Sequence, residues 1–252
     1  MNFNSFSIIM IFVSLILVGC KSVCDANFST TYNGNKYGCV INNTTHKVWL
    51  DRNLGATRVA RSITDTLSYG DYFQWGRKAD GHEDKTSKTT SVLATTLENP
   101  NSNFIVRAVD SDWVADGVDD NGSKRTAFLL KTDGKGICPN GFRVPTRQEW
   151  ENEYHTWKSN DTEGAYTSVL KLPTSGIRVA EAQGARLTEM GERGYYWTSE
   201  FDETRRLARY FRTTSGKGVN FRPGFPIYGL SIRCIRKNSA TAYEIAKNKY
   251  LE

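Results

Sequence analysis

Short apolar runs broken by Gly, Asn and Asp make up most of the chain from Val40 onwards, and sustained helical periodicity is nearly absent. Short apolar runs bounded by turn residues are typical of strands. The strands predicted in this way span residues 47–50, 126–131, 195–198, 206–213 and 230–236. The pattern predicts a loop-rich single domain of the α+β class, with short antiparallel strands and one or two main helices, rather than an alternating α/β repeat.

The clearest helix start follows Thr146, in the segment CPNGFRVPTRQEW at residues 138–150. The Thr146 hydroxyl can accept the amide N–H of Glu149 while the Glu149 carboxylate reaches back to the Thr146 N–H, which is a capping box. A helix that continues to residue 158 places three aromatic side chains on one face, those of Trp150, Tyr154 and Trp157. Because capping accounts for Glu149, we predict a structural segment rather than a catalytic one.

The segments on either side of residues 40–236 have their own signals. Residues 20–39 are polar and rich in Asn, and Asn33-Gly34 is a turn signal, so we predict a tether with a small hairpin. Residues 237–252 contain a second capping box, Thr241 with Glu244, and are predicted to form a short helix. The domain itself is expected to span residues 40–236.

Residues 1–19 contain an apolar run, from Ile8 to Val18, that is shorter than the roughly 20 residues a helix needs to cross a bilayer. We interpret it as a signal peptide. Leu17-Val18-Gly19-Cys20 resembles the lipobox of bacterial lipoproteins, which are cut before a cysteine that is then lipidated. Because the segment lacks Lys and Arg, a plain secretory signal and a buried N-terminal helix are the alternatives. We expect an exported protein, anchored through Cys20 in the bacterial cell envelope, at the outer membrane.

The chain has five cysteines. If Cys20 carries lipid, the other four can pair in three ways, and an exported chain disfavours an unpaired thiol. We favour a bond that closes a short N-terminal loop, Cys24 with Cys39, and one that closes a long loop, Cys138 with Cys234. Such bonds persist in an oxidising compartment, in agreement with export. Metal ligation is the weaker alternative, because no His or second Cys pair follows at zinc spacing.

The net charge is +6, but Lys and Arg are spread along the chain with no run of five or more. A basic exported protein could meet nucleic acid, anionic glycans or lipid headgroups. Dispersed charge is typical of a solvated surface, so we predict no nucleic-acid partner and a membrane contact through the lipid anchor.

The sequence contains no recognisable catalytic motif. Its histidines are His46, His82 and His155, and neither a Gly-x-Ser-x-Gly elbow nor a His-Glu-x-x-His motif occurs. An enzyme with dispersed site residues is the alternative that we would favour if His82 or His155 met buried carboxylates in a cleft. Weak candidate ligands for Ca²⁺, which prefers oxygen donors, are Asp116, Asp119 and Asp120. A solvated turn is the other interpretation of these aspartates, and no further cofactor is predicted.

Candidate ligand-binding residues come from two segments. Trp113 lies in an acidic, turn-rich segment and is predicted to be exposed, whereas Trp49, Trp75, Trp150 and Trp197 are expected in the core. The second group consists of Arg205, Arg209, Arg212, Arg222 and Tyr228. Exposed aromatic rings can stack on sugars or on partner side chains, although repeated Arg on an edge strand also serves solubility. The choice of the second group depends on a resemblance to lectin-like domains, which often bind through the region before the last strand.

Six ordered motifs resemble a known family. They are VWLDRNLGA (48–56), YGDYFQWGR (69–77), CPxGFRVPTxxEW (138–150), LP (172–173), GYYWTS (194–199) and SxRC (231–234). Together they resemble FISUMP, the Fibrobacter succinogenes major paralogous domain, seen in many exported and lipid-anchored bacterial proteins. The resemblance implies a C-type-lectin-like fold over residues 40–236, in which Cys138 and Cys234 would join the middle of the domain to its last strand.

The segment RVPTxxEW, residues 143–150, is also similar to a motif of formylglycine-generating enzymes, which share that fold class. Those enzymes use a reactive cysteine pair with copper, and a Cys138–Cys234 bond would leave no spare pair, so the similarity implies the scaffold alone. We therefore expect a lipid-anchored binding or adhesion module without catalysis, which recognises a glycan or a protein. The alternatives are a structural or pilus-associated envelope subunit, a formylglycine-generating-enzyme-like or other enzyme, and a hypervariable display protein.

Overall fold

The computed structural model describes residues 24, 28–98, 101–107 and 112–237. The signal peptide predicted at 1–19, the lipidated Cys20 and the helix predicted within 237–252 fall outside the described residues. The helices are α1 (Ser123–Leu129), α2 (Arg147–Tyr154) and α3 (Thr162–Thr167), with a 3-10 turn η1 (Thr66–Ser68). The strands are β1 (Thr30–Tyr32), β2 (Asn35–Tyr37), β3 (Cys39–Asn42), β4 (Lys47–Leu50), β5 (Phe73–Gln74), β6 (Thr89–Thr90), β7 (Phe104–Ile105), β8 (Phe142–Arg143), β9 (Ile177–Glu181), β10 (Gly184–Thr188), β11 (Arg193–Asp202), β12 (Leu207–Thr214), β13 (Gly218–Gly224), β14 (Gly229–Leu230) and β15 (Ile235–Arg236).

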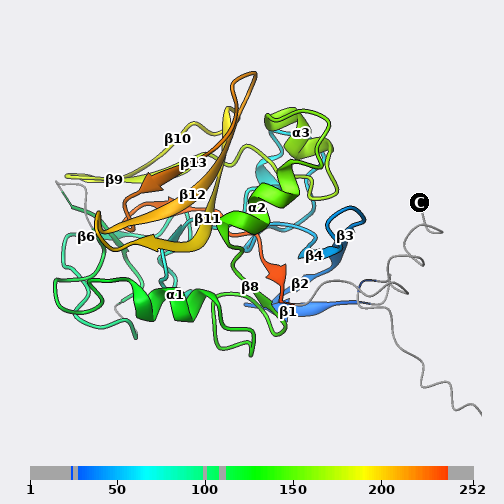
Figure 1. The fold of residues 1–252 in the computed structure, drawn as a ribbon. Helices are drawn as coiled ribbons and strands as arrows, with labels where there is room; N and C mark the ends of the chain where they lie inside the picture. The colour runs from blue at the N-terminus through cyan, green and yellow to red at the C-terminus, as the bar shows by residue number, and fades with distance from the viewer. Residues whose placement is uncertain (1–23, 25–27, 99–100, 108–111, 238–252) are drawn as a thin grey trace, which may run out of the picture.

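The strands form several small sheets that are mostly antiparallel. The longest strands make the sheet β11-β12-β13, and two four-stranded sheets have the orders β3-β4-β15-β8 and β10-β9-β14-β5. Helix α1 packs against β11, α2 packs against both β11 and β12, and α3 packs against β12 (Figure 1). Long loops join these elements, so the described residues confirm the predicted loop-rich α+β class.

The core is rich in aromatic side chains, and helix α2 contributes some of them. The Trp150 ring stacks on Phe211 of β12 with 4.8 Å between ring centroids, and Tyr154 and Trp157 contact the same ring. The predicted aromatic face of the helix is therefore confirmed. The four tryptophans expected in the core are completely buried: Trp49, Trp75, Trp150 and Trp197.

The predicted capping box at the start of α2 is present. The Glu149 N–H donates to the Thr146 hydroxyl at 3.2 Å, and the Thr146 N–H donates to the Glu149 carboxylate at 3.0 Å. The helix ends at Tyr154, four residues earlier than predicted, because the chain turns through residues 155–157 to bring Trp157 against Phe211.

One strand prediction is wrong. Residues 126–131 lie largely in α1 instead, because Asp119 accepts the backbone N–H groups of Lys124 and Arg125 and so holds the first turn of a helix. The predictions at 47–50, 195–198 and 206–213 are confirmed by β4, β11 and β12. The run at 230–236 is divided between the two short strands β14 and β15.

Both predicted disulfides are present. Cys24 bonds to Cys39 with 5.5 Å between their Cα atoms, and Cys138 bonds to Cys234 with 6.0 Å. The second bond lies next to the paired strands β8 and β15. The N-terminal hairpin is also confirmed, since β1 pairs with β2 across Asn33 and Gly34, which both have positive φ angles. Among the described residues, no helix combines the length and apolar character that crossing a membrane requires.

Candidate functional site

The predicted arginine surface does not form as one face. Side chains alternate along a strand, so Arg209 and Arg212 of β12 lie on opposite sides of the sheet. Arg212 lies opposite Tyr195 and Asn220, whereas Arg209 contacts Asp202 at 3.2 Å. Arg222 of β13 pairs with Tyr210 and so lies on the same face of the sheet as Arg212, whereas Tyr228 packs against Phe225 outside this sheet.

Trp113 is not an exposed contact residue, which corrects the prediction. Its side chain is 0% exposed, and its indole N–H donates to the carbonyl of Trp75 at 2.8 Å. The segment turns inward because Ala94 donates its N–H to the Trp113 carbonyl. The guanidinium groups of Arg77 and Arg125 lie over the indole ring.

The three aspartates suggested for calcium face two arginines. Asp119 is completely buried on Arg125, with 2.9 Å between Oδ2 and Nε. Asp116 and Asp120 are exposed and contact Arg206 at 3.0 and 2.7 Å. A cation here would have to replace both arginines, so calcium binding remains a prediction without geometric support.

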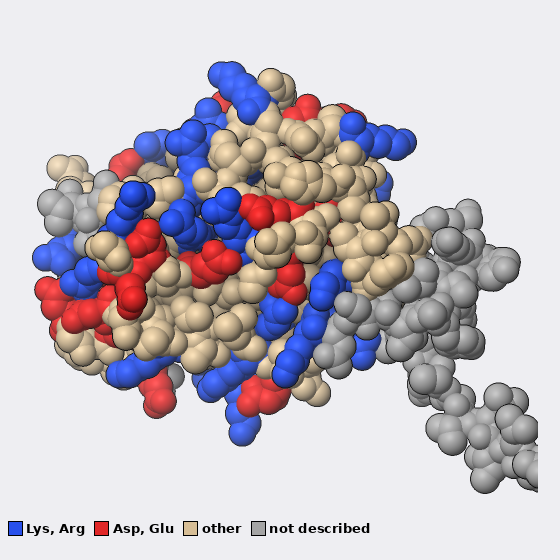
Figure 2. Space-filling model, viewed as in Figure 1, with Lys and Arg blue, Asp and Glu red and all other residues tan. Residues whose placement is uncertain are grey.

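On the face seen in Figure 2, Lys and Arg lie interleaved with Asp and Glu rather than in one continuous basic stripe. At the acidic loop this mixture arises because the exposed Asp116 and Asp120 pair with Arg206, which is distant in sequence. Such an arrangement is typical of a solvated surface, as the dispersed charges of the sequence indicated.

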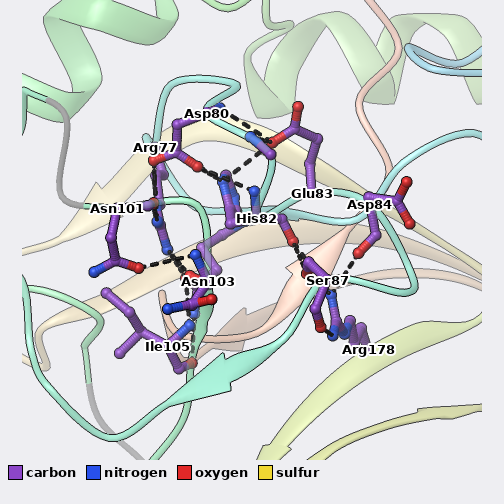
Figure 3. A network of polar contacts seen from close by, with 12 residues as sticks. Arg77, Asp80, His82, Glu83, Asp84, Ser87, Asn101, Asn103, Ile105 and Arg178 are labelled. Atoms are coloured by element: carbon purple, nitrogen blue, oxygen red, sulfur yellow. Dashed lines mark hydrogen bonds and ion pairs between the residues drawn. The ribbon is translucent and has the colours of Figure 1, made fainter.

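His82 lies in a buried polar network (Figure 3). Its Nε2 accepts the N–H of Gln74 at 3.1 Å, so Nδ1 carries the proton and donates to Asp80 at 2.8 Å. Arg77 also donates to Asp80 and Gln74, and Arg178 donates to the His82 carbonyl. Burial lowers the pKa of His82 to about 4, so the ring is neutral at pH 7. The meeting of His82 with carboxylates matches the enzyme alternative, but both ring nitrogens already have protein partners, which indicates a structural role.

The same cluster brings three potential metal ligands together. One atom each of Asp80, His82 and Glu83 lies within 4.8 Å of the others. However, the Glu83 carboxylate accepts the backbone N–H groups of Asp80 and Gly81, and the Arg77 guanidinium adjoins Asp80. A divalent ion would displace these bonds and face a buried cation, so the residues do not fit a resident metal.

Asp71 makes stability depend on pH. Burial, followed by the neighbouring carboxylates of Glu83 and Asp84, raises the pKa of the Asp71 carboxyl from 3.8 to about 7. A raised folded-state pKa contributes stability that is present below pH 4 and lost as the pH rises through 7. Asp71→Asn should therefore be more stable than the wild type at about pH 8, and this advantage should shrink towards about pH 5. Urea unfolding across this pH range measures it, with the exposed Asp133→Asn as control, and a constant difference for Asp71→Asn would contradict this explanation.

An open groove of about 530 Å³ lies at the end of β11. Its lining comes from residues 199–202 of β11 and the following Glu203, from Arg209 of β12, from Thr126 of α1 and Leu130 just after that helix, and from Thr146 at the start of α2. Of the ligand-binding residues predicted from the sequence, the groove contains Arg209. Arg205 lines a smaller adjacent pocket.

An irregularity in β11 forms the groove. The pairing of β11 with β12 shifts between Trp197 and Phe201, so the residues between them leave the regular ladder. In this part, Ser199 donates its N–H to the Pro145 carbonyl at 2.9 Å, which holds the start of α2 against β11. The Trp75 indole N–H donates to the Thr198 carbonyl at 2.9 Å. The irregular segment is therefore fixed from both sides.

Phe201 gives the groove an aromatic wall. Its ring stacks on Trp75 with 5.0 Å between centroids. Gly122, which precedes α1, has a φ of 67°, and a Cβ there would lie 2.5 Å from the Phe201 ring. Glycine is therefore required for α1 to begin this close to the ring.

The lining is polar and carries more negative than positive charge. Three carboxylates face the groove, those of Glu200, Asp202 and Glu203. Arg209 is the one cation among the described residues that line it, and it contacts Asp202. One oxygen of Glu200 accepts the N–H of Arg147 at 3.0 Å, which positions that carboxylate. Carboxylates accept hydrogen bonds from hydroxyl groups, and an arginine donates them. The groove can therefore bind a neutral ligand that carries many hydroxyls.

Sequence reasoning missed most of this lining. The acidic spacing of Glu200, Asp202 and Glu203 was the available signal, but the strand irregularity that gathers these residues leaves no pattern of its own. Thr126 and Leu130 were missed because their segment was assigned to a strand. Thr146 was recognised only as a helix cap.

Comparison of the chain with known protein families, with characterised proteins and with solved structures found no match. The FISUMP resemblance and the C-type-lectin-like fold therefore stay predictions from the six sequence motifs. The assignment of the groove as the candidate site is therefore supported by its geometry and not by similarity to other proteins.

Proposed function

We propose that this protein is a lipid-anchored binding module of the bacterial cell envelope, which recognises a glycan in the groove at the end of β11 without catalysing a reaction. The observation that carries the proposal is the lining of the groove. It combines carboxylates, one arginine, hydroxyl groups and the aromatic ring of Phe201 in one open site.

Each kind of group in the lining suits a sugar. The carboxylates of Glu200 and Glu203 can accept sugar hydroxyls, and Arg209 can donate to ring or hydroxyl oxygens. The part of the Phe201 ring that lines the groove offers an apolar contact for a sugar ring. The volume of about 530 Å³ falls within the range of roughly 300–1,000 Å³ that is usual for small-ligand sites.

The anchor and the fold belong to the same proposal. Because Cys24, Cys39, Cys138 and Cys234 are paired, Cys20 is the one cysteine left to carry a lipid. We take the fold to be C-type-lectin-like and the family to be FISUMP. The order of the six motifs supports both, as does the bond between Cys138 and the segment before β15.

A glycan array probed with the full chain in detergent tests the function. Strong binding to neutral glycans is expected. Glu200→Gln combined with Glu203→Gln should weaken it by about tenfold or more, because hydrogen bonds to charged groups contribute about 1.5–3 kcal/mol each. Gln at position 200 can still accept the Arg147 N–H, so the fold is preserved.

The matched control removes two exposed carboxylates elsewhere, with Glu163→Gln and Glu192→Gln, and should bind as the wild type does. If no glycan is retained by the wild type, or if both double variants lose the same signal, the groove is not a glycan site.

A further inference from the structure

A second pocket, of about 390 Å³, lies on another face of α1. Lys124 and Phe128 line it from the helix, Lys131 and Lys135 from the loop beyond the helix end, and Lys78 and Leu97 from the opposite wall. Lys124, Phe128 and Lys131 are spaced i, i+4 and i+7, whereas Thr126 and Leu130, which line the groove, fall on a different side. The pocket shares no residue with the groove, so a ligand site here is independent of the proposed function.

The pocket concentrates uncompensated positive charge. Within the described part of the chain, Lys78, Lys131 and Lys135 make no ion pair, and the Lys124 ammonium donates only to the Val118 carbonyl at 3.2 Å. Glu98 is the single carboxylate among the described residues that line the pocket. Four ammonium groups around one cavity repel one another, and an anion placed between them removes that repulsion.

Arg125 forms part of the pocket lining but does not add free charge. Its guanidinium is completely buried and contacts Asp112 at 2.6 Å and Asp119 at 2.9 Å. The lining therefore combines four exposed lysines with a neutralised arginine and the partly buried Phe128 and Leu97.

Two glycines bring the lysines together. A Cβ on Gly76 would lie 2.4 Å from the Arg125 Cβ, so only glycine allows the turn before Lys78 to approach α1. A Cβ on Gly136 would lie 2.8 Å from the Phe128 carbonyl, so glycine also lets the loop bearing Lys135 fold back on the helix end. The backbone conformation at these two glycines therefore brings the lysines close to one another.

We propose that this pocket binds an acidic sugar, a saccharide unit that carries a carboxylate or phosphate group. The lysines supply the charge for the acidic group, and Phe128 with Leu97 supplies an apolar surface for the sugar ring. A bare inorganic anion would use the lysines alone and leave the apolar surface exposed to water. The protein then has two saccharide sites of opposite charge, one on each of two faces of α1.

The test is an NMR titration of the full chain in detergent with four probes: glucuronate, glucose 1-phosphate, glucose and inorganic phosphate. The two acidic sugars should shift amide signals around Phe128 and Lys131, and glucose should not. Lys131→Gln combined with Lys135→Gln should weaken their binding by about tenfold, and raising the salt concentration should weaken it in the wild type. The matched control, Lys158→Gln with Lys217→Gln, removes the same charge from exposed positions elsewhere and should bind as the wild type does.

Three results would overturn the proposal. They are the absence of saturable binding by either acidic sugar, equal loss of binding in both double variants, and inorganic phosphate binding as tightly as glucose 1-phosphate. The variants tested on the glycan array alter the groove alone. The two experiments therefore distinguish a wrong assignment of the groove from a wrong assignment of this pocket.

Discussion

Replacing Arg125 by methionine should lower the free energy of unfolding by about 3–5 kcal/mol, the usual cost of removing one partner from a buried ion pair. The guanidinium is 0% exposed and contacts Asp112 and Asp119, of which Asp119 is also fully buried. Methionine has a similar length but leaves both carboxylates without their cation. The same guanidinium lies over the rings of Trp75 and Phe201, so its loss also removes contacts that support the groove.

A matched control is an arginine that contacts the same acidic loop from the turn between β11 and β12. Arg206 also joins two aspartates, Asp116 and Asp120, but its side chain is 42% exposed. Arg206→Met should change stability by about 1 kcal/mol or less, as exposed ion pairs do. Urea unfolding of the two variants measures the contrast. Similar losses in both would show that burial does not decide the effect and would contradict the structure of this loop.

Removing the Cys138–Cys234 bond should have an effect of comparable size. The bond closes a loop of 96 residues, for which chain entropy predicts a loss of about 4–5 kcal/mol, while the Cys24–Cys39 bond closes 15 residues and predicts about 3 kcal/mol. The double serine variant Cys138→Ser with Cys234→Ser should therefore unfold at the lower urea concentration. Both half-cystines of this bond are completely buried, which adds packing to the effect.

The double variant Cys24→Ser with Cys39→Ser provides the comparison under identical non-reducing conditions. It should retain a cooperative transition, because the bond lies beside the N-terminal hairpin rather than in the centre of the core. If the N-terminal bond proves the more important of the two, the place assigned to Cys138 and Cys234 in the core is wrong.

The sequence predicted local features well where a short pattern determines them. The capping box of Thr146 and Glu149, the Asn33-Gly34 turn and strand β4 each depend on neighbouring residues, and each is confirmed. Counting cysteines in an exported chain left three possible pairings, and the one that we favoured is present. In each case the interaction that decides the structure lies within the pattern or follows from simple chemistry.

Predictions failed where a distant residue decides the outcome. Trp113 lies in a polar, acidic segment, but contacts with Trp75 and Arg125 draw it into the core. Residues 126–131 were predicted as a strand, but Asp119 initiates a helix there. The arginines near the C-terminus are close in sequence, yet strand alternation places Arg209 and Arg212 on opposite faces. Of the residues predicted to bind a ligand, Arg209 alone lines the groove.

The most direct test of the groove as the binding site is to fill the groove with a large side chain. Thr126 lines the groove, whereas the next residue, Ala127, is exposed and lines neither the groove nor the lysine pocket. On the same glycan array, Thr126→Trp should lose glycan binding while Ala127→Trp keeps it, with both variants unfolding at the same urea concentration. Undiminished glycan binding by a folded Thr126→Trp variant would contradict the assignment of the groove as the recognition site.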